Sequence, residues 1–144
     1  MIPARATAQA DARALRVADF EQLQAKLQER VRNQLVLDAK VQLKFEVRRP
    51  PLEPTPASRA LAAHSKEIYD ELGMPMTIAD VATGGGTDAA FAALQAKGAV
   101  VEGFGLSGFG AHSNNAEYVR LDSIEPRLYL TTRLVMDVAQ DKVK

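Results

Sequence analysis

Hydrophobic and polar residues alternate with two different periods along the first third of the chain. Over residues 5–15 alanines fall on one face and polar residues on the other, and alternation returns between Val41 and Val47. A period of two predicts a β-strand in each segment. Between them, large apolar residues recur at helical spacing, at Phe20, Leu23, Leu27, Val31 and Leu35. This stripe predicts a helix over about 19–34, with Asp19 as its N-cap.

The segment 48–56 holds four prolines in nine residues and predicts a connector rather than a helix or a central strand. Beyond it the pattern alternates between helices and short strands. The predicted helices cover about 56–72, 87–97 and 123–140, and the predicted strands cover 77–81 and 99–101. This order predicts the α/β class, with a three-layer arrangement around a sheet.

Charge and composition narrow the classes of function. The 18 basic residues balance the 18 acidic ones, so the chain lacks the electrostatic footprint of a nucleic-acid binder. No apolar run approaches the roughly 20 residues that span a bilayer, so no membrane partner is expected. The chain has no cysteine, which excludes thiolate chemistry and disulfides. The compartment stays open between cytoplasm and periplasm.

A first glycine-rich stretch, TGGGTD at 83–88, lies between a predicted strand and a predicted helix. Its bare backbone and the free N–H groups of the helix start suit an anion. A tight connection without a ligand is the alternative. The stretch fits neither the phosphate loop nor the dinucleotide-binding pattern.

A second glycine-rich stretch, 103–118, is a long loop that contains His112, one of two histidines. Zinc needs three or four ligands, and no HxxxH, HExxH or HxD pattern accompanies this residue. Spacing alone therefore favours a surface or packed histidine. His64 lies on a predicted amphipathic helix and is interpreted as exposed and without a role.

Arg13, Arg48 and Arg49 lie on or next to the two predicted strands of the first segment. Two arginines at one sheet edge suit a bidentate clamp for a carboxylate. The plainer interpretation is that they are solvated charges at strand ends.

Four stretches together resemble one family. They are IPARATAQADAR (2–13), FEVRRPP (45–51), TGGGTDAAFAAL (83–94) and the run from EGFGLSGFGAHSNN to RLVMD (102–137). The chain resembles the C-terminal part of bacterial glutamate carboxypeptidases of the carboxypeptidase G type. Their zinc exopeptidase family also includes aminoacylase, peptidase T and succinyl-diaminopimelate desuccinylase.

The resemblance implies a domain organisation. Residues 1–48 correspond to the second half of a lid domain that mediates dimerisation, so a homodimer is expected. Residues 49–56 form a proline-rich hinge, and residues 57–144 form the C-terminal part of the zinc peptidase catalytic domain.

The resemblance also assigns site residues. His112 matches the last zinc ligand, and Glu117 is a candidate for orienting a ligand. Arg13 and Arg49 match arginines that hold the substrate, and the substrate pocket is lined by Gly84, Gly85, Gly86 and Thr87. The other ligands of the family's two zinc ions, and the glutamate that activates water, have no counterpart in this chain.

The expected function is therefore that of part of a zinc carboxypeptidase that hydrolyses an amide next to a free carboxylate. The substrate would be a small peptide or an N-acyl amino acid. Because one histidine cannot hold two zinc ions, the chain alone is expected to be inactive. The alternative is a non-catalytic dimerisation or anion-binding module derived from the peptidase.

Overall fold

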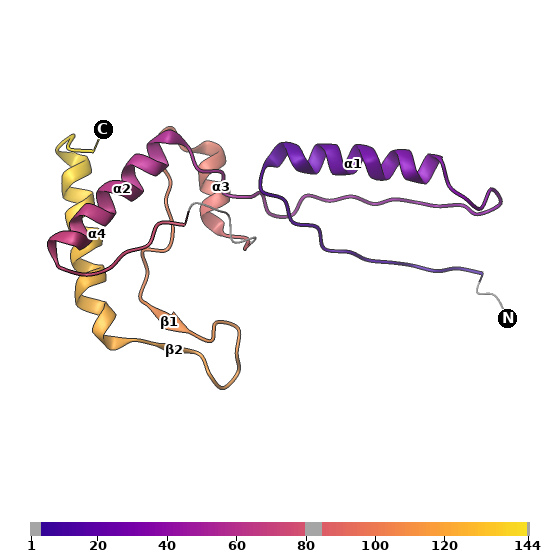
Figure 1. The fold of residues 1–144 in the computed structure, drawn as a ribbon. Coiled ribbons are helices and arrows are strands. Elements are labelled where there is room, and N and C mark those ends of the chain that lie inside the picture. The colour runs from indigo at the N-terminus through magenta and orange to yellow at the C-terminus, as the bar shows by residue number, and fades with distance from the viewer. Residues whose placement is uncertain (1–3, 80–84, 144) are drawn as a thin grey trace.

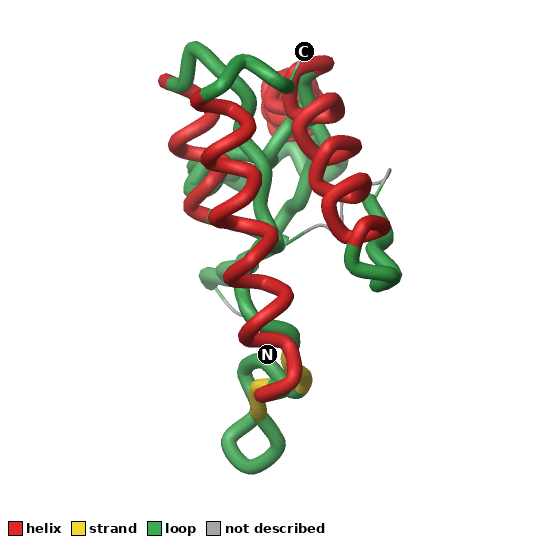
Figure 2. Tube along the Cα trace, turned by 90° about the vertical axis from the view of Figure 1, so that its left-hand side faces the viewer, coloured by secondary structure: helices red, strands yellow, loops and turns green. Residues whose placement is uncertain are grey.

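A computed structural model describes residues 4–79 and 85–143 of the 144-residue chain (Figure 1). Helices are its main regular elements, and two short strands form a hairpin near one end (Figures 1 and 2). The elements in chain order are α1 (Val17–Arg32), α2 (Pro56–Glu71), α3 (Asp88–Gln95), β1 (Gly108–Phe109), β2 (Tyr118–Val119), a 3₁₀ turn (Leu121–Ser123) and α4 (Ile124–Ala139).

The four predicted helices are confirmed, with small shifts at their ends. At the start of α2, Pro56 occupies the first helical position and the Thr55 hydroxyl accepts the Ser58 N–H at 3.1 Å. Gly73, with φ of 66°, follows the end of this helix. The start of α1 was predicted wrongly: Arg16 is the N-cap, and Asp19 lies inside the first turn.

The strand predictions over 5–15, 41–47 and 99–101 are wrong, because the structure assigns no strand to these segments. Segment 77–81 has no strand up to residue 79, and its last two residues lie outside the described ranges. Within those ranges the strands that form are β1 and β2, which pair antiparallel. Alternation shows which face of a strand would be buried, but a strand also needs a partner for its N–H and C=O groups. The mixed α and β class holds, while the three-layer sheet is not formed by the described residues.

The core lies where α2 packs against α4. Ile68 and Tyr69 of α2 meet Leu130 and Leu134 of α4, and Ile68 and Leu130 have no exposed surface. Burying a side chain of this size stabilises a fold by about 1.5–3 kcal/mol. Around this cluster pack the partly buried Leu61, Met74, Met76 and Phe104.

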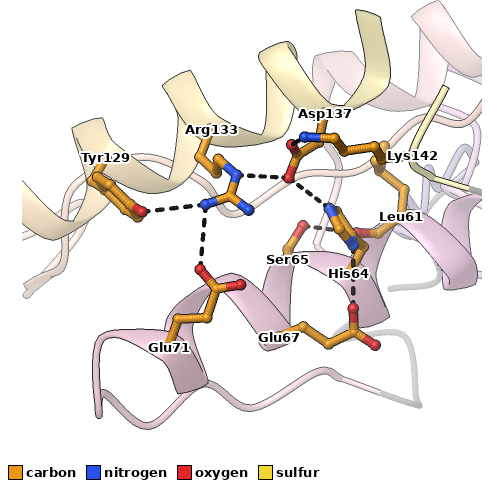
Figure 3. Close-up of polar contacts among 9 residues, drawn as sticks. All are labelled: Leu61, His64, Ser65, Glu67, Glu71, Tyr129, Arg133, Asp137 and Lys142. Atoms are coloured by element: carbon orange, nitrogen blue, oxygen red, sulfur yellow. Dashed lines mark hydrogen bonds and ion pairs between the residues drawn. The ribbon is translucent and has the colours of Figure 1, made fainter. Parts of the chain in front are cut away.

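A buried carboxylate lies at the edge of this core (Figure 3). Only 1% of the Asp137 side chain is exposed. Its carboxylate accepts hydrogen bonds from three side chains. These are His64 Nε2 of α2 at 3.0 Å, Arg133 Nε of α4 at 2.9 Å and Lys142 Nζ of the C-terminal tail at 3.2 Å. Arg133 also reaches Glu71 of α2 at 3.3 Å. Because an unpaired buried charge is costly, this polar cluster ties α2 to α4.

Outside this core the chain exposes much apolar surface. Its accessible surface is 12014 Å², whereas a folded monomer of 15.6 kDa exposes about 7,300 Å². Leu35 and Leu37, after α1, are 100% and 88% exposed. Within the described residues α1 contacts no other helix or strand, although its first N–H, on Val17, donates to Glu53 Oε1 at 2.8 Å. The chain therefore buries less than a self-contained domain of its mass.

Truncating the core tests the α2–α4 packing. We expect Leu130→Ala to lower the free energy of unfolding by about 2–5 kcal/mol, because it leaves a cavity at a fully buried position. Leu128→Ala is the matched control on the same helix, since Leu128 is 65% exposed, and it should change stability by less than about 0.5 kcal/mol. Denaturant unfolding followed by circular dichroism measures both. Equal effects would contradict the assignment of the core.

Acid should weaken the same contact. The hydrogen bond from His64, supported by Arg133 and Lys142, lowers the pKa of Asp137 from 3.8 to about 2. Because the folded-state pKa is the lower one, the stabilisation is complete above about pH 4 and is lost as the pH falls towards 2. We expect Asp137→Asn to reduce stability at pH 7 and to flatten the pH dependence in that window. The measurement is the unfolding midpoint of both proteins from pH 6 to pH 2. If the midpoint of Asp137→Asn falls with pH as steeply as that of the unchanged chain, Asp137 is not the group responsible.

Candidate functional site

The structure brings one predicted arginine onto the first glycine stretch. Arg49 Nη1 donates to the carbonyl oxygen of Gly86 at 3.3 Å, and its Nη2 lies 3.8 Å from Asp88 Oδ1. A Cβ added to Gly86 would lie 2.9 Å from Arg49 Cδ, so the missing side chain permits this approach. Arg49 and Gly86 are 37 residues apart, and both were predicted to face the substrate.

The glycine stretch leads directly into α3. Thr87 is the N-cap of this helix, and its hydroxyl accepts the Ala89 N–H at 3.2 Å. Gly85 and Gly86 are exposed, and Gly84 lies outside the described residues. With a cationic side chain beside the N-terminus of a helix, this region suits a negatively charged group.

Arg13 lies on the extended segment before α1. Its Nε is 3.2 Å from Asp11 Oδ2, and its side chain is 66% exposed. Arg49 is the arginine that contacts the glycine stretch, at Gly86 and Asp88. That Arg13 and Arg49 share one carboxylate stays a prediction.

His112 lies in the loop between β1 and β2. It is exposed and has a φ of 68°, which places a non-glycine residue in the left-handed region. Such backbone costs on the order of 1–3 kcal/mol and is concentrated at functional sites. Glu117 is exposed and lies directly before β2. The hairpin and the N-terminal segment extend in different directions from the α2–α4 pair (Figure 1).

The described residues do not by themselves provide a zinc site. No group of three or more His, Cys, Asp or Glu side chains in the described ranges is arranged so that it could hold a metal ion. A catalytic zinc ion is held by three protein ligands, whereas the predicted site contributes one imidazole here.

The interpretation of His64 as exposed was wrong. Its side chain is 20% exposed and contacts Asp137 with one ring nitrogen and Glu67 Oε2 with the other, at 3.2 Å (Figure 3). The partner on α4 lies 73 residues away, so helical spacing could not reveal it. A signal was present: Asp137 continues the buried stripe of Leu130 and Leu134 at i, i+4 and i+7, where a carboxylate needs a cation.

Comparison with known proteins places the chain in a family. Residues 5–137 match the peptidase family M20/M25/M40. The chain therefore belongs to this family of peptidases, which confirms the resemblance stated from its motifs. It is 39% identical over 142 residues to carboxypeptidase G2 of Pseudomonas sp. (strain RS-16). That alignment covers 99% of this chain and 34% of carboxypeptidase G2, so the chain spans about a third of its relative's length.

The α-helices of the described ranges are α1 to α4. None of the helices there is long and apolar enough to cross a bilayer.

The loop that carries His112 depends on one glycine. Gly110 has a φ of 74°, and a Cβ there would collide with the backbone carbonyl of Ala116. We expect Gly110→Ala to cost at least about 1 kcal/mol and to open the hairpin. Hydrogen exchange of the Arg120 amide, which donates to Ser107 O at 2.8 Å, reports the opening.

Gly105→Ala is the matched control, because nothing lies within 4 Å of a Cβ at that position. It should leave exchange at Arg120 unchanged. Equal protection in both variants would show that Gly110 does not hold the loop.

Proposed function

We propose that the chain is the C-terminal portion of a zinc-dependent metallopeptidase of the glutamate carboxypeptidase type. Its reaction would be hydrolysis of an amide next to a free carboxylate, in a small peptide or an N-acyl amino acid. The proposal is supported by the 39% identity to carboxypeptidase G2 along nearly the whole chain. Residues 1–48 would belong to the lid, 49–56 to the hinge and 57–144 to the catalytic domain.

The contact between Arg49 and Gly86 is the observation that carries this proposal. Carboxypeptidases must recognise a terminal carboxylate, and a guanidinium offers it two parallel N–H donors. Arg49 keeps a 57% exposed side chain while it lies beside the N-terminus of α3. A carboxylate bound here would gain from the arginine and from the free N–H groups of the helix start. Arg13 would approach the substrate from the lid.

His112 would provide one zinc ligand. Its position on an exposed, strained loop suits a side chain that meets groups contributed by another part of the peptidase. Glu117, on the same loop, would orient that ligand through a hydrogen bond. When bound, zinc would supply an activated water, and the ligands missing here would complete its coordination.

The chain alone would therefore bind carboxylates at most weakly and would not hydrolyse amides. A general base and two or more further zinc ligands would have to come from the remaining length of the peptidase. The second candidate function is a dimerisation or anion-binding module. It is favoured by segments 5–15 and 41–47, which alternate as strands do but form no strand within the described residues, and which could form one by pairing with another copy.

The test compares this chain with a chimera of carboxypeptidase G2 in which the chain replaces the matching third. With zinc and an N-acyl-glutamate, we expect the chimera to hydrolyse the amide and the chain alone to show no turnover. Turnover by the chain alone, comparable to that of carboxypeptidase G2, would overturn the proposed inactivity. A folded chimera without turnover would overturn the proposed reaction. Sedimentation velocity on the chain alone tests whether it acts as a dimerisation module. A stable monomer would argue against that second candidate function.

Variants of the chimera assign the residues. Arg49→Ala should raise KM about 10- to 100-fold, because a hydrogen bond to a charged group is worth about 1.5–3 kcal/mol. Arg48→Ala is the control, since Arg48 is 79% exposed and its nearest ion pair, with Glu46, is 3.7 Å long; KM should change less than about twofold. His112→Ala should reduce kcat by more than the roughly 10- to 100-fold typical of residues that support a metal ligand. Equal effects of both arginine variants would contradict the role of Arg49.

A further inference from the structure

The ring of His64, on α2, lies between two carboxylates (Figure 3). Its Nε2 is 3.0 Å from Asp137 Oδ2 of α4, and its Nδ1 is 3.2 Å from Glu67 Oε2 on the next turn of α2. An ionised carboxylate can only accept hydrogen bonds, and a neutral imidazole has a single N–H. A neutral ring would therefore turn one bare nitrogen towards a carboxylate oxygen, whereas the imidazolium has an N–H for each of them.

The charges around His64 also favour the protonated ring. The groups that face it or its carboxylate partners come from α2, from α4 and from the C-terminal tail: Glu67, Glu71, Tyr129, Arg133, Asp137 and Lys142. Three of these groups are carboxylates and two are cations. The cluster therefore carries one excess negative charge while His64 is neutral, and protonation of the ring removes that excess.

Burial makes the contact with Asp137 the stronger of the two. The side chains of His64 and Asp137 are 20% and 1% exposed, whereas that of Glu67 is 72% exposed. Water screens the contact with Glu67, but a charge-assisted hydrogen bond shielded from water is strong. His64 and Asp137 are 73 residues apart, on the two helices that form the core. The protonation state of this ring therefore bears on how firmly α2 holds α4.

We propose that His64 is a pH-sensitive clamp between α2 and α4, closed while its ring carries two protons and weakened when it loses one. Histidine is the side chain whose charge ordinarily changes between pH 5 and pH 8. Because the folded chain favours the imidazolium, the clamp stabilises the fold on the acid side of this range and is lost as the pH rises through it. The sign is opposite to that of Asp137, whose protonation weakens the fold below about pH 4.

The clamp affects more than the two helices. The segment that leads to His112 is hydrogen-bonded to α4 and to the residue before it, through Arg127 Nη1 to Gly103 O at 3.2 Å and through the Ser107 N–H to Ser123 Oγ at 3.0 Å. A looser contact between α2 and α4 leaves this segment less firmly placed relative to α2. The clamp needs neither metal nor substrate, so it stands or falls apart from the proposed peptidase activity.

The experiment follows thermal unfolding of the whole chain from pH 5.5 to pH 8.5. The melting temperature of the unchanged chain should fall by about 4 °C or more over this range. His64→Gln keeps a hydrogen-bond donor but removes the titrating ring. Its melting temperature should be lower at pH 5.5 and should vary by less than about 2 °C. If this variant keeps the slope of the unchanged chain, the proposal is overturned.

His112→Gln is the matched control, because His112 is the only other histidine in the sequence. It lies on an exposed loop away from the α2–α4 core, so this variant should keep the pH dependence of the unchanged chain. Loss of the dependence in His112→Gln would assign it to the wrong histidine and overturn the clamp.

Nitrogen NMR of the imidazole ring keeps the proposal testable if His64→Gln does not fold. The His112→Gln variant, labelled with ¹⁵N, contains one histidine and so gives one pair of ring signals. At pH 7.0 both nitrogens of His64 should have chemical shifts typical of a mainly protonated ring, whereas an unperturbed histidine, with a pKa of about 6.5, is mostly neutral there. A mainly neutral ring at pH 7.0 would overturn the proposal.

Discussion

The buried carboxylate of Asp137 is the interaction on which the arrangement of the C-terminal half depends. Its donors come from α2, from α4 and from the tail, so α2 and α4 must meet in one orientation to satisfy it. Apolar packing alone would tolerate small slides between the helices. The hairpin with His112 is held to α4 by a further hydrogen bond. The Ser107 N–H donates to the Oγ of Ser123, the residue before α4, at 3.0 Å. Arg127 of α4 adds a hydrogen bond to Gly103 O and a cation–π contact with Tyr69.

A second, weaker link joins the N-terminal segment to the rest. It consists of the Arg49 contact with Gly86 and the hydrogen bond from the Val17 N–H to Glu53, which lies in the proline-rich segment. Exposed polar contacts of this kind contribute little to stability. They leave Arg49 partly exposed at the N-terminus of α3, where the proposed carboxylate site lies.

Membership of the peptidase family M20/M25/M40 and the exposed apolar surface are considered together, because both concern how much of a peptidase fold the chain contains. The chain aligns with about a third of carboxypeptidase G2, and its described residues contain one small core. Within the described residues the segments 5–15 and 41–47 form no strand, and much of the apolar surface of α4 stays exposed. Each becomes ordinary when a further layer of structure covers it.

The sequence by itself determined the helices, because capping, glycine ends and 3.6-residue periodicity act within one turn. Its motifs also indicated the family, which the match over residues 5–137 confirms. The tertiary structure decided what depends on distant partners. His64 bonds a carboxylate 73 residues away, Arg49 meets Gly86 across 37 residues, and the alternating segments at 5–15 and 41–47 form no sheet. Periodicity predicts which face of an element a residue occupies. The side chains or backbone groups that this residue contacts are known only from the packed chain.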